Sequence, residues 1–415
     1  NDVSRKGNMI IAKDPVIKQG ERATWSMDTN PENDVRYSIR EKVNNVVNPT
    51  PVQYGSDDTG FGRVTQVISG NQTKNPLQKA IGLVKNFYFE MVDEDTAAHK
   101  VDREAGKRIG HELEDNEKFY DKVRMAPAIA RGHAEKLIAG DKKHGEVVKS
   151  RIKNETLKQQ FNPEATLKNV LDTVEDKAMN GKYGDFLSKH KMRDWAQVLD
   201  TYLAAWRLKE MYNLHLQNWT SEHAAWKQRK AEALKNGETF REKEPVYKPY
   251  KLPGKLTIQD INAAIKAAPP EVEKAAQLYY AFNKNMTIIL ADAGLVSGEN
   301  YQALNSKYQR YCPLMRDFSD TAAADEFIEG LTRGGKGPVN VSNPLKRISQ
   351  EGSHRGLLSP LQNSIKACAI YCDRAERNKV GQMAVEMAEK YRLDDMIWRA
   401  EGKNTADAKN CIFTV

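Results

Sequence analysis

The chain has 415 residues, of which 40% are hydrophobic and 29% are charged. Its 64 basic and 56 acidic side chains give a net charge of +8, a mild excess that is compatible with an anionic partner but establishes none. We expect no membrane span, because the best apolar run, 286–296, contains Asp292 and is far shorter than the roughly 20 residues of a spanning helix. Four cysteines in so long a chain argue against a disulfide framework.

The first 70 residues are rich in turn-forming residues and show little periodicity. Residues 45–62 combine Asn-Pro, Thr-Pro, Gly-Ser and Thr-Gly-Phe-Gly, which are signals of turns and linkers. We therefore expect residues 1–70 to form an extended linker or docking segment that is poorly ordered by itself.

Residues 71–245 are predicted to form a helical region. Asn75-Pro76 and Asn162-Pro163 are predicted helix starts, since asparagine caps a helix and proline suits its first turn. Further helices are expected over roughly 98–113 and 114–139, where apolar residues recur three or four positions apart.

The longest helix is expected between residues 191 and 235, where neither proline nor glycine occurs. Trp195, Tyr202 and Trp206 keep helical spacing within it. At 1.5 Å per residue this helix would be roughly 65 Å long, which exceeds the width of a small domain. It should therefore serve as a spine, a hairpin arm or an oligomer contact, with the polar stretch 227–244 in solvent.

The segment 244–254 contains several prolines and is the best candidate for a domain boundary. Residues 255–415 are predicted to form a C-terminal helical bundle. Its helices are expected to begin at residues with capping or N-terminal proline signals, namely Thr257, Pro270, Ser297 and Ser359-Pro360. The last of these helices should run to about Arg392. The predicted fold class is all-α: an extended multi-helix assembly with one long helix, a C-terminal helical bundle and a mostly irregular N-terminal segment.

No cluster of residues has the pattern of an active site or a metal site, so we expect neither catalytic residues nor a cofactor. Residues 330–337 approach a phosphate-binding loop, but Gly337 stands where the magnesium-binding Ser or Thr would be. Cys368 and Cys372 lie one helical turn apart. The pattern favours two cysteines packed in a core, and the alternative is a zinc site completed by two further ligands. The acidic run 112–117 is expected to form the first turn of a helix and to face water.

Basic residues near aromatic ones are the candidates for contact with nucleic acid or another partner. Tyr308 and Tyr311 could stack on bases while Arg310 grips a phosphate. Equally, the tyrosines could pack in the core while Arg310 and Arg316 pair with acids. The basic loop around residues 346–355 is a stronger candidate for phosphate contact, although a solvated loop is the favoured interpretation. The complete set of candidate contacts is Arg310, Arg316, Lys336, Lys346, Arg347, Arg355, Arg374 and Arg377.

Three signals in a fixed order carry a family resemblance. They are Tyr311-Cys-Pro-Leu-Met-Arg316, Asn343-Pro-Leu-Lys-Arg347 and the stretch Arg374–Gln382. This order resembles the helical domains of large polyvalent proteins carried by bacteriophages and related mobile elements, and Arg36–Arg40 is similar to a junction between modules of such chains. The resemblance covers about 255–392, is weaker over 75–110 and does not extend to the long helix. It brings no catalytic residue, because the resembling modules are not the enzymatic ones.

The resemblance implies a non-enzymatic structural or interaction part of a large phage protein, an internal virion protein delivered with the genome. Such a chain is expected in the phage particle and then in the host cytoplasm. Its expected partners are other segments of a longer polypeptide, other virion proteins or a second copy. Asn1 and the strand-like residues 410–415 favour a piece of a longer chain over a frayed tail. The alternatives are an accessory interaction domain of an intracellular polyvalent enzyme in the bacterial cytoplasm, and a DNA-binding module.

Overall fold

A computed structural model of the chain describes residues 3–6, 9–12, 59–69, 94–115, 117–140, 142–313, 352–354 and 356–393. The chain forms two compact units, residues 1–49 and 50–415. In the first unit, β1 (Val3–Lys6) and β2 (Met9–Ala12) pair as an antiparallel hairpin, which the sequence did not predict. The described part of the second unit is built from helices with one short strand pair, which confirms the predicted all-α fold class.

The described residues just before position 70 belong to the core of the second unit. They form α2 (Gly60–Gln66) and β3 (Ile68–Ser69). Phe61 and Val64 are only 1% and 0% exposed. The linker predicted up to residue 70 is therefore wrong for this stretch, because apolar side chains three or four positions apart give it one buried face.

The first long helices are α4 (Glu94–Ile109) and α5 (Phe119–Ala139); the helix predicted at Asn75-Pro76 lies outside the described residues. The acidic run 112–117 lies in the loop between α4 and α5, so the prediction that it forms a helix first turn is wrong. The start of α5 is instead stabilised by Asp102 of α4, whose carboxylate accepts the backbone N–H groups of the first two α5 residues at 2.7 and 2.9 Å.

Three shorter helices follow: α6 (Lys142–Ser150), α7 (Glu155–Gln160) and α8 (Leu167–Glu175). The predicted helix start at Asn162-Pro163 is wrong, because α8 begins after Thr166, whose hydroxyl accepts the Asn169 N–H. The Asn162 side chain instead accepts the Glu164 N–H at 3.0 Å and shapes the turn before the helix.

After α9 (Lys177–Lys189) comes the longest described helix, α10 (Trp195–Lys235), which confirms the prediction for 191–235. Asp194 caps it by accepting the Gln197 N–H at 2.8 Å. Its 41 residues span about 60 Å. The buried residues of α10 run from its start to Met211, and Trp226 is the one buried side chain farther out.

The C-terminal helices begin where the sequence predicts: α11 (Ile258–Ala267), α12 (Pro270–Asp292), α13 (Gly298–Lys307) and α15 (Pro360–Tyr391). Thr257 and Asp260 form a reciprocal capping box at α11. Gly294 follows α12 with a φ of +82°, a conformation that glycine adopts without strain.

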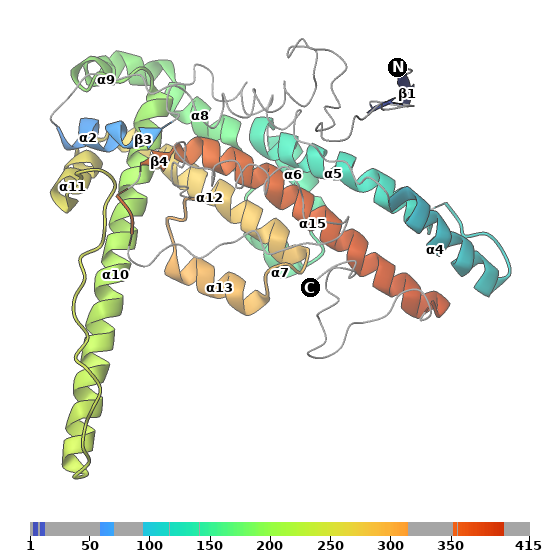
Figure 1. The fold of residues 1–415 in the computed structure, drawn as a ribbon. Coiled ribbons are helices and arrows are strands. Elements are labelled where there is room, and N and C mark those ends of the chain that lie inside the picture. The colour runs from blue at the N-terminus through green and yellow to red at the C-terminus, as the bar shows by residue number, and fades with distance from the viewer. Residues whose placement is uncertain are drawn as a thin grey trace, which may run out of the picture. The chain divides into compact units, whose positions relative to one another are not determined.

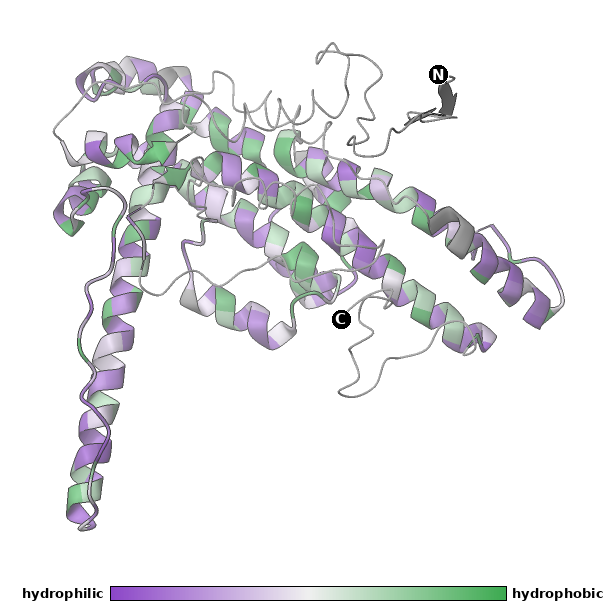
Figure 2. Cartoon of the chain, in the orientation of Figure 1, coloured by the Kyte–Doolittle hydropathy of each residue, from purple (hydrophilic) through white to green (hydrophobic). Residues whose placement is uncertain are grey.

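The main core lies among α8, α10, α12 and α15, and α5 runs along α15 (Figure 1). Hydrophobic residues concentrate in these packed helices, whereas the outer half of α10 is largely hydrophilic (Figure 2). None of the described helices is long and apolar enough to cross a membrane.

Two backbone pairings connect the segment 352–358 to earlier parts of the second unit. β4 (Leu357–Leu358) pairs in parallel with β3, and Lys251 bridges to Gly352. The segment 244–254 is extended, as predicted, but residues on both sides of it contribute to the same core. It therefore connects parts of one compact unit, and it does not separate two cores.

Candidate functional site

The segment Tyr308–Pro313, which includes the first three residues of the stretch 311–316, folds back from α13 onto α12. The Tyr308 N–H still bonds the Leu304 carbonyl at 2.9 Å, which ends α13. From there the chain reaches Tyr279, whose hydroxyl lies 3.3 Å from the Cys312 sulfur. The segment therefore positions the end of α13 against α12 and the start of α15.

Cys312 is part of a fully buried polar network. The Tyr279 hydroxyl donates to the Pro360 carbonyl at 3.0 Å and shares a hydrogen bond with Ser364 at 2.7 Å. The Ser364 hydroxyl in turn donates to Asn283 at 2.9 Å. Burial raises the pKa of the Cys312 thiol to about 12, so the thiol stays protonated at neutral pH.

Arg310 is committed to contacts within the protein. Its guanidinium lies 3.8 Å from the centroid of the Trp206 ring and donates to Glu273 at 3.1 Å. Burial opposes ionisation of Glu273, but hydrogen bonds from Tyr202 and Gln277, together with Arg310, lower its pKa. Of the two interpretations of this stretch, the pairing of Arg310 with an acid is the one that the structure shows.

Arg207 of α10 lies beneath the same segment and is 1% exposed. Its guanidinium is 4.7 Å from the centroid of the Tyr308 ring and 5.5 Å from that of Tyr311, and it pairs with Glu210. Cation–π contacts of this kind hold both tyrosine rings in place. The sequence did not single out Arg207, because helical spacing alone does not show that a charged residue is buried.

A pocket of about 330 Å³ opens between α12 and α13. It is lined by three tyrosines, by apolar residues and by amide and amine groups: Gln277, Tyr280, Ala281, Lys284, Thr287, Leu304, Asn305, Tyr308, Gln309 and Tyr311. The Tyr280 hydroxyl is buried and forms no hydrogen bond of ordinary geometry among the described residues, although the Arg310 guanidinium interacts with it. The lining of this pocket therefore combines aromatic rings with groups that can donate and accept hydrogen bonds.

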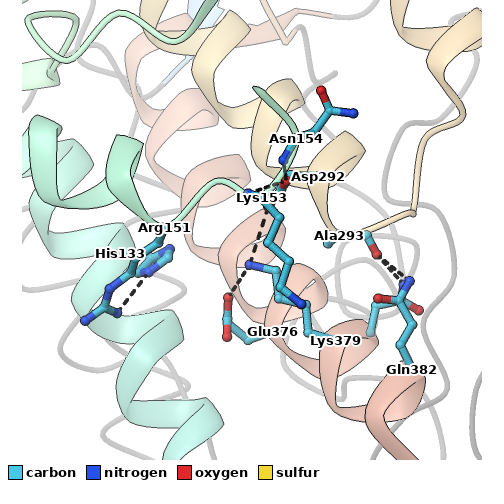
Figure 3. A network of polar contacts seen from close by, with 10 residues as sticks. His133, Arg151, Lys153, Asn154, Asp292, Ala293, Glu376, Lys379 and Gln382 are labelled. Atoms are coloured by element: carbon cyan, nitrogen blue, oxygen red, sulfur yellow. Dashed lines mark hydrogen bonds and ion pairs between the residues drawn. The ribbon is translucent and has the colours of Figure 1, made fainter. Parts of the chain in front are cut away.

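A second polar network ties the other end of α12 to α15 and to the loop between α6 and α7 (Figure 3). The Asp292 carboxylate accepts the backbone N–H groups of Lys153 and Asn154, each at 2.9 Å. The Ala293 carbonyl accepts from the side chain of Gln382 at 3.1 Å. These contacts satisfy backbone groups at helix ends, so the network is best explained as structural support.

His133 of α5 lies at the edge of this network, and Arg151 is 3.3 Å from its Nε2 atom (Figure 3). Burial, together with the positive charges of Lys379 and Arg151, lowers the pKa of His133 to about 3. The imidazole is therefore neutral at physiological pH.

Asp200 of α10 is a fully buried carboxylate at the start of α15. One of its oxygens accepts the Leu361 N–H at 2.9 Å, and the other has no partner among the described residues. Burial raises the pKa of Asp200 to about 7, although hydrogen bonds from Ser359 and Leu361 oppose the shift. This carboxyl therefore titrates near neutral pH while the described residues bury it completely.

Two of the predicted contact residues are buried in α15. Arg374 and Arg377 are 8% and 9% exposed. Arg377 donates from Nε to both carboxylate oxygens of Asp373 at 3.0 Å. Their prediction as nucleic-acid contacts is corrected accordingly, because neighbouring elements cover the guanidinium groups. The other candidates, Arg316, Lys336, Lys346, Arg347 and Arg355, lie outside the described residues.

The cysteines of α15, Cys368 and Cys372, are buried, which agrees with the interpretation that the pattern favoured. A hydrogen bond with Cys368 and burial raise the pKa of Cys372. Among the described residues, no group of three or more His, Cys, Asp or Glu side chains is arranged to hold a metal ion.

Comparisons of the chain with models of known families, with curated proteins and with solved structures gave no match. The chemistry of the candidate site is therefore interpreted from its own geometry.

Proposed function

We propose that this chain is a non-enzymatic structural and interaction part of a large phage protein, carried inside the particle and delivered with the genome. The phage assignment rests on the resemblance of residues 255–392 to helical domains of polyvalent phage proteins. The interaction role rests on the arm, which we define as the outer half of α10 (from Leu214) with the returning chain up to residue 250. The arm is mostly exposed and projects beyond the core that holds the other helices (Figure 1).

The arm is stabilised by its own contacts. Trp226 packs edge-on against Phe240 at 5.7 Å, and its indole N–H donates to the Glu242 carbonyl at 3.1 Å. Arg229 binds both carboxylate oxygens of Glu242 at 2.6 and 3.0 Å. An element that contributes this little to the core is best accounted for by a partner that uses its surface.

Exposed apolar side chains give the arm a surface that a partner could cover. Leu216, Leu234 and Val246 are 40%, 66% and 79% exposed. Three of the six exposed large apolar side chains among the described residues lie on the arm, so a partner that covers the arm would bury them.

The packing of α5 against α15 is compatible with delivery through a narrow channel, which requires unfolding. Charged or ionisable groups are buried on these helices, namely His133, Lys366, Asp373, Arg374, Glu376 and Arg377. Buried charges add little net stability, because desolvation offsets their mutual attraction. Burial alone lowers the pKa of Lys366 to about 8. Helices that bury such groups contribute a smaller free energy of unfolding than helices that bury only apolar side chains would.

The direct test is quantitative mass spectrometry of purified particles from the source system. The proposal expects peptides of this chain at a fixed number of copies per particle. Abundance in infected cells with absence from particles would refute it and would favour the alternative, an accessory interaction domain of an intracellular polyvalent enzyme.

A variant pair tests the role of the arm in the same particles. The double substitution Leu216→Ser with Leu234→Ser should reduce incorporation severalfold, because it removes apolar surface from the partner interface. Met125→Ser is the matched control, since Met125 is 53% exposed on α5 and lies away from the arm. Equal incorporation of both variants would contradict a role of the arm in assembly.

A further inference from the structure

The pocket between α12 and α13 has the size of a site for one small molecule. Its volume of about 330 Å³ lies at the lower end of the range of about 300–1,000 Å³ that small-ligand sites occupy. It is therefore large enough for one compact ligand and too small for a folded partner.

Aromatic rings form a large part of its lining. Tyr280, Tyr308 and Tyr311 all border the pocket. Arg207, beneath two of these rings, holds them before any ligand arrives. Rings that are already fixed lose little side-chain freedom on binding, which makes them an effective platform for stacking on a planar ligand.

The polar groups of the lining match the edge of a planar heterocycle. Tyr280 is 6% exposed, and the Arg310 guanidinium, 5.9 Å from the centroid of its ring, is the polar group that interacts with its hydroxyl. The hydroxyl forms no hydrogen bond of ordinary geometry among the described residues, so it remains able to donate one to a ligand. The amide groups of Asn305 and Gln309 also line the pocket and can both donate and accept hydrogen bonds.

Lys284 is the one charged residue among those that line the pocket, and two arginines lie nearby. Arg310 is paired with Glu273 and Arg207 with Glu210. Lys284, by contrast, has no acidic partner within the described part of the chain. The ammonium group of Lys284 is therefore the group that can attract a phosphate.

We propose that this pocket binds a single nucleotide, with the base against the tyrosine rings, the base edge at Tyr280 and the phosphate at Lys284. The nucleotide is either free or one unit of a single-stranded nucleic acid, since both present an unpaired base beside a phosphate. A base inside a double helix is stacked on both faces and does not reach the rings. This site goes beyond the proposed function, because a carried structural protein does not require a nucleotide pocket.

The test is isothermal titration calorimetry, which measures the affinity of the purified full chain for each of four ligands. These are adenosine 5′-monophosphate, thymidine 5′-monophosphate, a short single-stranded oligonucleotide and the corresponding duplex. Binding of a mononucleotide identifies a free nucleotide as sufficient. Binding of the single strand alone identifies the polymer as the source. Absence of both overturns the proposal, as does binding of the duplex with an affinity equal to that of the single strand.

Variants locate the binding in the pocket. Tyr280→Phe keeps the ring and removes the hydroxyl, so the affinity should fall about 3- to 10-fold. Lys284→Gln should lower the affinity about 5-fold and reduce its dependence on salt. Lys274→Gln is the matched control, because Lys274 is an exposed lysine of the same helix that does not line the pocket. An equal loss in both lysine variants would show general attraction to a basic surface and overturn the site, and unchanged affinity in both pocket variants would do the same.

Discussion

Replacing Asp200 with asparagine should change the pH dependence of stability by a predictable amount. Asp200 is 0% exposed, and its pKa is raised from 3.8 to about 7, mainly by burial. A carboxyl with a raised pKa in the folded state contributes its full stability below the pKa of the unfolded state, and this contribution is lost as the pH rises through the folded pKa. Between pH 4 and pH 7 the free energy of unfolding should therefore fall by about 1.4 kcal/mol per pH unit, or about 4 kcal/mol in total.

Asparagine retains an oxygen that can accept the Leu361 N–H but does not titrate. The stability of Asp200→Asn relative to the wild type should therefore rise by about 4 kcal/mol between pH 4 and pH 8. Urea denaturation at four or five pH values in this range measures the difference, with Asp185→Asn as the control for loss of an exposed carboxylate on α9. A difference between Asp200→Asn and wild type that stays constant with pH would refute the argument from burial.

Three further predictions follow from the geometry. Asp292→Ala should lower the free energy of unfolding by about 2–4 kcal/mol, because two backbone N–H groups of the α6–α7 loop lose their acceptor. Thermal denaturation measures this loss, and a change below about 1 kcal/mol would contradict the role of the Asp292 carboxylate. Trp226→Ala should raise hydrogen exchange in the arm and leave exchange in the core helices unchanged, since Trp226 is bonded within the arm; faster exchange throughout would show that arm and core unfold together. The thiols of Cys312, Cys368 and Cys372 should react with an alkylating reagent at pH 8 only after denaturation, because all three are buried; rapid native labelling, read by peptide mass spectrometry, would contradict this.

Local signals predicted the helices well. The caps at Asp194 and Thr257, the proline at the start of α12 and Gly294 after it act through contacts within a few residues, so their effect can be read from the sequence. The Asn162-Pro163 start failed because the same residues also favour a turn, and the Thr166 cap lies closer to the apolar stripe of α8.

Burial of polar residues was the part that the sequence could not predict. Arg374 and Arg377 were assigned to the surface, as charged residues usually are. They are covered because other elements surround α15 on most of its circumference, as the nearly continuous buried residues of this helix indicate. Arg207 and Asp200 are further examples, since each depends on contacts with residues more than 100 positions away or on a loop that folds back.

Only part of the pocket lining could be predicted from the sequence. Tyr308 and Tyr311 were noted as possible stacking residues. Tyr280 and Lys284 lie one helical turn apart on α12, so their spacing shows that they share one face of this helix. Nothing in the sequence shows that α13 returns to face them. The return depends on the tight turn at Gly294 together with the anchoring of Cys312 at Tyr279.

The parallel pairing of β3 with β4 affects how the chain folds while it is being synthesised. The Leu357 N–H bonds the Val67 carbonyl at 2.7 Å, and α5 packs along α15, so the earliest helices of the second unit are completed by its last ones. A ribosome that adds about 5–20 residues per second needs on the order of tens of seconds to reach α15 after it has made α2. During that interval β3 lacks its strand partner β4, and α5 lacks the helix that it packs along. Contacts of such long sequence separation form slowly, so this part of the fold is completed only after the last helix has been made.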